Sequence, residues 1–217
     1  LLCGDSTDSE QVSKLMNGKK ADMVFTDPPY GMKLDTDYSG MSGGNRKGKK
    51  YDKVIGDNED FKPELIHTIF ACFDYCEEIF IWGVDYYFDL IPNFKSGSLI
   101  VWDKTLQTNG DAGYNSEFEL CWSKTPHKKE VLHFNWFRYF GLSSQDIKTR
   151  EHPTQKPLQV ITPFIEKYSQ NIIADLFLGS GSTMVAAHQL KRKCYGMELD
   201  PKYCQVIIDR MRNLDPD

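Results

Sequence analysis

The stretch from Ile172 to Pro201 reads IIADLFLGSGSTMVAAHQLKRKCYGMELDP and has the pattern of a strand, a helix and a second strand. Its first residues, IIAD, are almost continuously apolar, which is typical of a strand buried on both faces of a sheet. A glycine-rich turn follows, then a helix expected to run through Leu190, and a second strand at Cys194–Met197. Two strands joined through a helix predict an α/β fold, in which helices cover a parallel sheet.

The turn between this strand and its helix suits a bound ligand. Gly179 and Gly181 let the backbone turn sharply and approach a bound molecule. Glu198 follows about 20 residues later, at the end of the next strand, where a carboxylate can accept both hydroxyls of a ribose. A dinucleotide fingerprint would need a small residue where this chain has Met184, and no Gly-Lys-Ser/Thr loop for phosphates follows. An adenosyl ligand without phosphates fits better, and S-adenosylmethionine is the obvious one.

The two ends of that ligand would need further partners. Its methionine end carries an amine and a carboxylate, for which Asp175, Ser182, Thr183 and Lys156 are candidates. Its adenine carries an amine, which Asp5 could bind, because Asp5 follows another predicted strand at residues 1–3.

A second stretch, Ala21 to Gly31, reads ADMVFTDPPYG. A predicted buried strand ends there at Asp27, Pro28, Pro29 and Tyr30, because two prolines fix φ and remove two N–H donors. A carboxylate, backbone carbonyls and an aromatic ring then lie at the carboxyl end of a strand, where open α/β sheets bind their ligands. These groups suit a planar molecule that carries an amine. Alone, such a short motif is equally compatible with a proline-rich turn and a surface tyrosine.

Three motifs taken together resemble the amino-directed DNA methyltransferases: DPPY at 27–30, HPTQKP at 152–157, and DLFLGSGST with GMELDP at 175–183 and 196–201. Their order, with the catalytic motif before the cofactor motif, is similar to that of the permuted beta group of adenine methyltransferases. The resemblance covers nearly the whole chain. It implies a Rossmann-like methyltransferase fold, with a seven-stranded, mostly parallel sheet, one antiparallel strand and helices on both faces.

The resemblance also assigns roles by position. The catalytic motif of the family matches Asp27, Pro28 and Tyr30; its cofactor motifs match Asp175, Phe177, Gly179, Gly181 and Glu198; the element that closes over the methionine end matches Thr154 and Lys156. The implied reaction moves a methyl group from S-adenosylmethionine to the 6-amino group of a flipped adenine in DNA. The aspartate form of the motif goes with adenine, whereas a Ser-Pro-Pro-Tyr form is commoner for cytosine.

Other functions stay open. An enzyme with the same cofactor could act on cytosine N4, on RNA or on a protein amide. A protein of another class, a catalytically inactive DNA-binding subunit, could retain the fold, although the intact Asp27, Tyr30, Gly179 and Glu198 argue against it.

The chain is expected to be one methyltransferase domain over 1–217, with a mobile basic loop at 36–53 and a target-recognition segment at 104–150. The segment is short for the family. Both regions carry basic residues that could contact DNA, while solvated charges and aromatic core strands are the alternatives. The candidates are Arg46, Lys47, Lys49, Lys50, Lys128, Lys129, Arg138, Lys148 and Arg150. The net charge of −5 argues mildly against a nucleic-acid partner, but the distribution of charge matters more.

The remaining expectations are broader. The six cysteines form no zinc-binding spacing, so we expect reduced thiols, no metal and a cytoplasmic protein. The resemblance to DNA methyltransferases implies a bacterial or phage origin. DNA is the expected partner; a homodimer, a cognate restriction endonuclease and a fused N-terminal domain are further candidates. The chain starts at Leu1 and enters a strand at once, so we expect a piece of a longer protein. A helix is also predicted at 8–17, because Thr7 and Glu10 are spaced as a capping box and Gly18 is a plausible C-cap. Further helices are predicted at 61–75, 157–168 and 201–212, and strands at 79–82, 99–102 and 118–122.

Overall fold

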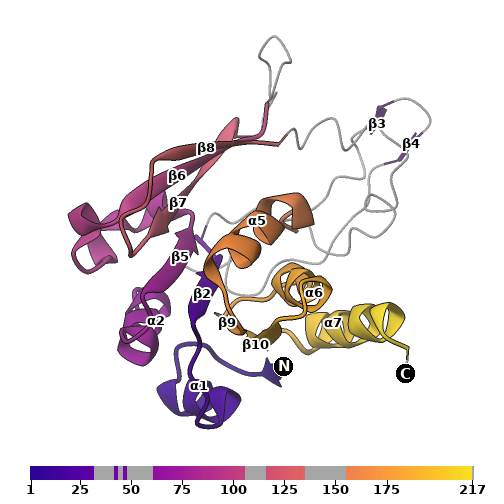
Figure 1. The fold of residues 1–217 in the computed structure, drawn as a ribbon. Coiled ribbons are helices and arrows are strands. Elements are labelled where there is room, and N and C mark those ends of the chain that lie inside the picture. The colour runs from indigo at the N-terminus through magenta and orange to yellow at the C-terminus, as the bar shows by residue number, and fades with distance from the viewer. Residues whose placement is uncertain (32–41, 44–45, 48–60, 106–115, 135–154, 217) are drawn as a thin grey trace.

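The computed structural model describes residues 1–31, 42–43, 46–47, 61–105, 116–134 and 155–216. Its main sheet has eight strands in the order β1-β10-β9-β2-β5-β7-β6-β8 (Figure 1). Their bounds are β1 Leu2–Cys3, β2 Met23–Thr26, β5 Glu78–Trp82, β6 Ser98–Asp103, β7 Phe118–Ser123, β8 Glu130–His133, β9 Ile172–Asp175 and β10 Lys193–Glu198. A separate antiparallel pair joins β3 (Ser42–Gly43) to β4 (Arg46–Lys47).

The sheet is parallel except for one strand. β7 runs antiparallel to both of its neighbours, β5 and β6, while β8 pairs in parallel with β6. The predicted α/β fold with one antiparallel strand is therefore confirmed, with eight strands rather than seven. β8 was not anticipated from the sequence, because its EVLH run is short and directly follows Lys128 and Lys129, and only alternate side chains are partly buried.

Helices cover both faces of the sheet, as predicted. α1 (Ser9–Met16) and α2 (Glu64–Phe73) lie on one face, and α5 (Leu158–Tyr168) and α6 (Ser182–Gln189) on the other (Figure 1). β2 shows why both faces are filled: Val24 points into the first core, and Met23 and Phe25 point into the second. This alternation with a period of two is the geometry of a strand that is buried on both sides. The last helix, α7 (Pro201–Leu214), contacts β1 and β10.

Both ends of α1 differ from the prediction. The N-cap of α1 is Asp8, whose carboxylate accepts from the Glu10 and Gln11 N–H groups, rather than Thr7. The C-cap is Asn17 in the left-handed conformation, one residue before the expected Gly18. Aspartate and threonine are both good N-caps, so the competition between neighbouring caps moved the boundary. None of the helices in the described ranges is long and apolar enough to cross a membrane.

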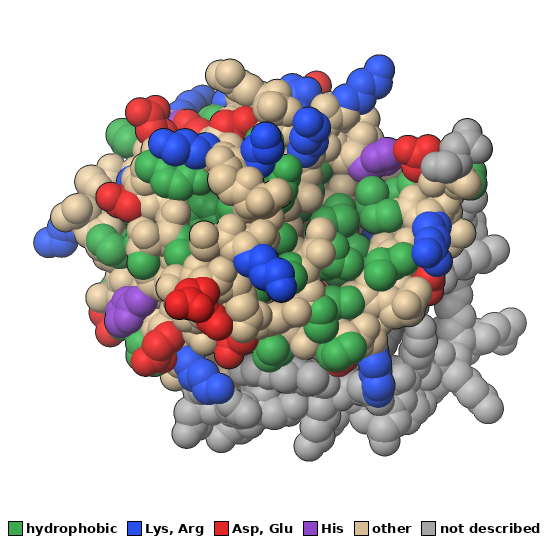
Figure 2. All heavy atoms as spheres, turned by 90° about the horizontal axis from the view of Figure 1, so that it is seen from below, with side chains coloured by type: hydrophobic (Ala, Val, Ile, Leu, Met, Phe, Trp, Pro, Cys, Tyr) green, Lys and Arg blue, Asp and Glu red, His purple; other side chains and the backbone are tan. Residues whose placement is uncertain are grey.

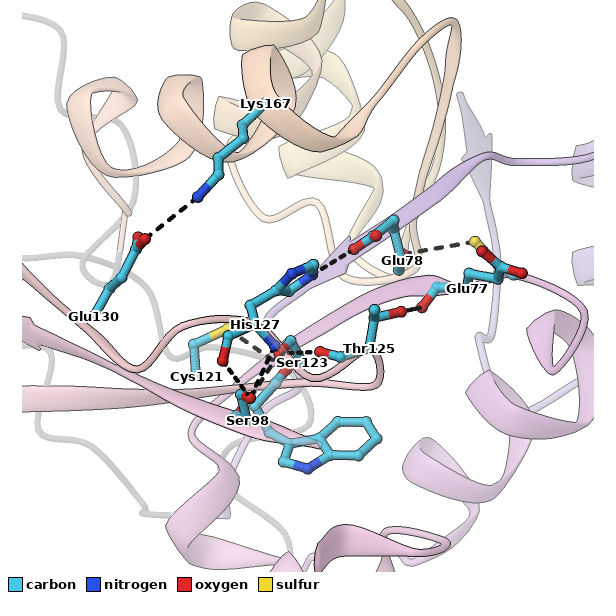
Figure 3. A network of polar contacts seen from close by, with 11 residues as sticks. Glu77, Glu78, Ser98, Cys121, Ser123, Thr125, His127, Glu130 and Lys167 are labelled. Atoms are coloured by element: carbon cyan, nitrogen blue, oxygen red, sulfur yellow. Dashed lines mark hydrogen bonds and ion pairs between the residues drawn. The ribbon is translucent and has the colours of Figure 1, made fainter. Parts of the chain in front are cut away.

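The turn between β7 and β8 is held at the amino-terminal edge of the parallel strands. There the Ser98 hydroxyl donates to the His127 carbonyl at 2.8 Å, and the His127 ring pairs with Glu78 at 2.9 Å (Figure 3). The Thr125 hydroxyl donates to the Glu77 carbonyl at 2.8 Å. Glu78 and Ser98 are the first residues of β5 and β6, so this polar network fixes the turn at the edge opposite to Asp27.

Candidate active site

Asp27 lies at the carboxyl end of the central strand β2, directly after the buried Thr26. Its side chain is 29% exposed, so it faces a partly open space. The Tyr30 hydroxyl donates to Asp27 Oδ1. Burial, reinforced by the Asp27 charge, raises the pKa of Tyr30 well above its usual value. This hydroxyl therefore stays protonated and remains a donor at neutral pH.

A second aromatic residue lies against Tyr30. The rings of Tyr30 and Tyr86 are parallel, at an interplanar angle of 7°, with their centroids 4.7 Å apart. Gly83, at the end of β5, makes this approach possible: its φ is +69°, and a Cβ there would lie 2.0 Å from the Tyr30 ring. Tyr86 is 50% exposed. The motif tyrosine thus belongs to an aromatic surface beside Asp27 that sequence reasoning did not identify.

Lys156 lies beside Asp27. Its ammonium is 2.9 Å from Asp27 Oδ2 and 2.7 Å from Glu119 Oε2, and Lys104 contacts the other oxygen of Glu119. Lys156 was predicted to bind the methionine end of a cofactor; here its ammonium faces Asp27 of the Asp-Pro-Pro-Tyr turn. Glu119 and Lys104 were not candidates at all, because nothing in their local sequence distinguishes them from ordinary surface charges.

Asp175 connects the glycine-rich turn to β2, the strand that ends at Asp27. This buried carboxylate accepts from the Thr26 hydroxyl at 2.9 Å and from the Phe177 N–H at 3.0 Å. Burial raises the pKa of Asp175 to about 6, and hydrogen bonds from Thr183, Phe177 and Thr26 limit the rise. Because Thr26 precedes Asp27, one hydrogen bond joins the two motifs across the sheet. This brings together two of the predicted sites.

The glycine-rich turn itself is shaped around Glu198. Gly179 and Gly181 have φ of +53° and +82°, a region that favours glycine. Glu198 accepts from the Gly179 N–H at 2.7 Å and from the Asp200 N–H at 2.8 Å. Burial raises the pKa of Glu198 to about 7, against the effect of these N–H donors.

One polar atom at this turn is unsatisfied. The Ser182 hydroxyl, at the first residue of α6, is buried and has no hydrogen-bond partner among the residues that the structure describes. Buried hydroxyls are normally paired, and the N-terminus of a helix favours a negatively charged group. The geometry of this turn therefore fits a ligand with a carboxylate near Ser182 and hydroxyls near Glu198.

Asp5 lies at the same edge of the sheet. It follows β1, which pairs in parallel with β10 so that Cys3 is opposite Glu198. The Asp5 carboxylate is exposed and accepts from the Thr7 N–H at 2.9 Å and the Thr7 hydroxyl at 2.8 Å. The structure therefore places Asp5, Glu198 and Asp175 at the carboxyl ends of three neighbouring strands.

The residues predicted to contact DNA are not brought to Asp27 within the part of the chain that the structure describes. Lys128 and Lys129 are exposed in the turn between β7 and β8, at the edge opposite to Asp27, so the structure does not bring them to the site. Arg46 and Lys47 belong to β4. Most of the 36–53 loop and much of the 104–150 segment lie outside the described residues. So do six of the predicted site residues: Lys49, Lys50, Arg138, Lys148, Arg150 and Thr154.

The described surface also carries mixed charges. On the face seen from below in Figure 1, acidic and basic side chains both lie among hydrophobic and uncharged ones, and several acidic side chains are grouped at its lower left (Figure 2). A DNA backbone is attracted by clustered Lys and Arg. This face is therefore a poor candidate for the DNA-binding surface.

Comparison with known proteins places this site in a family. A family model described as DNA methylase matches residues 21–209, and the chain belongs to that family. The type II methyltransferase M2.MboI of Moraxella bovis is 27% identical, with 90% of this chain and 82% of the relative covered. The matched residues include both motifs, so the chain is an S-adenosylmethionine-dependent DNA methyltransferase, and the site described above is its candidate active site.

Two solved structures share the fold. The M1.HpyAVI complex with S-adenosylmethionine has a TM-score of 0.55 and 20% identity, covering 94% of this chain and 96% of that one. The PvuII DNA methyltransferase, which is cytosine-N4-specific, has a TM-score of 0.57 and 15% identity, covering 95% of this chain and 84% of that one. At these identities the likeness shows the fold and leaves the target base to be inferred from the site.

Proposed function

We propose that this protein methylates the 6-amino group of adenine in DNA, with S-adenosylmethionine as the methyl donor. One observation carries the proposal: the Asp-Pro-Pro-Tyr turn and the glycine-rich turn meet at one edge of the sheet, joined by the hydrogen bond between Thr26 and Asp175. A base-binding group and a cofactor-binding turn are thereby held next to each other. Positioning of two reactants in this way can supply up to about 7–11 kcal/mol of the barrier reduction.

The glycine-rich turn would hold S-adenosylmethionine. Glu198 would accept the ribose hydroxyls, Asp5 the adenine amine, and the unsatisfied Ser182 hydroxyl would donate to the carboxylate at the methionine end. Asp175, already joined to Thr26 and Phe177, would support the turn and accept from the methionine amine. When bound, the cofactor supplies an electrophilic methyl group on a sulfonium.

The chain's own groups would prepare the target amine. The adenine 6-amino group is conjugated with its ring and is a poor nucleophile. Acceptors at Asp27 Oδ and the Pro28 carbonyl would hold its two protons and favour a nitrogen with a free lone pair. Tyr30 would stack on the base in place of its present partner, Tyr86. Asp27 acts here as a positioned hydrogen-bond acceptor, which requires no strong base.

The target base must leave the duplex to reach Asp27, at a cost of a few kcal/mol. Basic residues in the 36–53 loop and the 104–150 segment would contribute phosphate contacts that offset this cost. The exposed Tyr86 ring, beside Tyr30, offers the flipped base a first aromatic contact.

The target base can be identified directly. Unmethylated DNA is incubated with the protein and S-adenosylmethionine, digested to nucleosides, and separated by mass-resolved chromatography. We expect N6-methyladenine and no N4-methylcytosine, because the motif has Asp27 where serine is commoner for cytosine. N4-methylcytosine as the product would establish the alternative reaction, and no modified base in DNA would contradict the proposal. Sequencing of the methylated positions then reports the recognition site.

Cofactor binding should depend on pH through Glu198. Only the carboxylate form accepts two ribose hydroxyls, and burial raises the pKa of Glu198 to about 7. Affinity should therefore rise as pH increases through 7, and at about pH 6 the dissociation constant should be roughly tenfold higher than at about pH 8. Calorimetric titration with S-adenosylmethionine at several pH values measures this change. The Glu198→Gln variant, which cannot titrate, should lose the dependence; a pH-independent wild type would contradict the assignment.

A further inference from the structure

Lys156 is a buried cation shared between two carboxylates. Its side chain is only 8% exposed, and its ammonium contacts Asp27 at 2.9 Å and Glu119 at 2.7 Å. The same ammonium lies over the Trp82 ring, 4.5 Å from the centroid. An ammonium has three N–H donors. The number of them that point to Glu119 therefore determines how many remain to hydrogen-bond to Asp27.

Glu119 forms the centre of this cluster. Its other carboxylate oxygen contacts Lys104, so that acids and lysines alternate from Asp27 through Lys156 and Glu119 to Lys104. The four charges sum to zero, which makes the burial of Lys156 tolerable. Burial alone would raise the pKa of Glu119, but the two lysines hold it down to about 2. The carboxylates likewise hold the pKa of Lys156 well above its usual value, although burial opposes them.

Glu119 is also rigidly placed. It lies in β7, opposite Trp102 of β6, while Cys121 two residues later is opposite Trp82 of β5. The strand register therefore fixes Glu119 between the two tryptophans that contact the Lys156 ammonium. Lys156 itself precedes α5 and belongs to no helix or strand. Because Glu119 is held by the sheet, it can fix the position of Lys156, which lies on a connecting segment.

Both oxygens of Asp27 are already engaged in this arrangement. The Tyr30 hydroxyl donates to Oδ1 and Lys156 donates to Oδ2. A carboxylate offers about four lone-pair positions, so room for the target amine remains as long as Lys156 uses only part of them. Without Glu119, a second Lys156 donor could turn to Asp27 and compete with the amine.

We propose that Glu119 is a positioning residue for methyl transfer: it holds the Lys156 ammonium at a shared position and so keeps Asp27 available as an acceptor. This inference rests on the proposed function of Asp27. Glu119 touches neither substrate nor cofactor in this scheme and acts only through Lys156.

A double-mutant cycle tests this dependence on Lys156. In single-turnover methylation, Glu119→Gln should lower the rate about tenfold, with the KM for DNA unchanged within about twofold. In a Lys156→Gln background the same replacement should change the rate less than about twofold, because the intermediary is absent. Glu119→Asp, which keeps the charge, should recover part of the rate. Additive effects, or a wild-type rate in Glu119→Gln, would overturn the proposal.

Glu130→Gln is the matched control. It makes the same change in a strand residue and breaks an ion pair with Lys167 of α5, at 3.3 Å (Figure 3). Glu130 is the first residue of β8, at the edge of the sheet opposite to Asp27. Its rate should equal that of the wild type. Thermal unfolding of each variant separates loss of rate from loss of folding.

A second readout is independent of activity. In protein labelled with ¹⁵N-lysine, the buried Lys156 ammonium, assigned by its loss in Lys156→Gln, should exchange with water about tenfold faster in Glu119→Gln and at the wild-type rate in Glu130→Gln. Unchanged exchange in Glu119→Gln would overturn the positioning role even if the wild type were inactive on DNA. An inactive wild type with faster exchange in Glu119→Gln would support the positioning of Lys156 and contradict the proposed function of the site.

Discussion

Replacement of Asp27 by asparagine should lower the rate of methyl transfer by about 10³-fold and leave the affinity for S-adenosylmethionine within about twofold of wild type. The removal of one preorganised group that interacts with the reacting centre costs about 10²–10³ in rate in well-studied enzymes. Here two effects add to that loss. An asparagine amide presents one acceptor where the carboxylate presents two, and the Lys156 ammonium loses one of its two partners.

Cofactor affinity should be preserved because no hydrogen bond links Asp27 directly to the described residues of the glycine-rich turn; the connection runs through Thr26 and Asp175. Single-turnover kinetics with labelled cofactor measures the rate, and calorimetry measures binding. Asp209→Asn, an exposed position on α7, is the matched control and should behave as wild type. Near-normal turnover in Asp27→Asn would refute the assigned role of the motif.

Replacement of Glu198 by alanine should raise the dissociation constant for S-adenosylmethionine about 100-fold. Hydrogen bonds to a charged group contribute about 1.5–3 kcal/mol each, and a hundredfold change corresponds to about 2.7 kcal/mol. Part of the loss would come from the turn itself, because the Gly179 and Asp200 N–H groups lose their acceptor. At saturating cofactor the methylation rate should recover, since Glu198 does not contact the target base.

Calorimetry with the folded variant measures this loss. Glu166→Ala, an exposed acid on α5, makes the same truncation away from the turn and should bind as wild type. DNA affinity should be unchanged in both variants. If Glu198→Ala bound the cofactor normally, the ribose would have to lie elsewhere.

The segment that could be predicted best is the one with the strongest local signals. The strand predicted at 172–175 is observed as β9, the one at 194–197 extends to Lys193–Glu198, and the helix predicted at 201–212 extends to Leu214. Apolar runs, glycines at positive φ and a proline at the start of a helix act over a few residues. The same signals place Asp27, Asp175 and Glu198 at strand ends, where parallel sheets bring them to one edge.

Where local signals were weak, the prediction was incomplete. The β8 strand was missed, because pairing with β6 rather than its own pattern makes Glu130–His133 a strand. The N-cap of α1 moved from Thr7 to Asp8 because neighbouring residues offer equivalent caps. Lys128 and Lys129 were grouped with the candidate DNA contacts by charge alone, and the sheet places them at the opposite edge from Asp27.

The sequence by itself thus determined the class of fold, and it located at strand ends the two turns that form the candidate site. Only the tertiary structure decided what surrounds Asp27. Glu119 and Lys156 come from distant parts of the chain, and they meet at 2.7 Å because the register of β7 between β5 and β6 brings Glu119 to that point. Gly83 likewise matters because the Tyr30 ring lies against it. Such contacts depend on the packing of segments that are far apart in the chain, which no local pattern encodes.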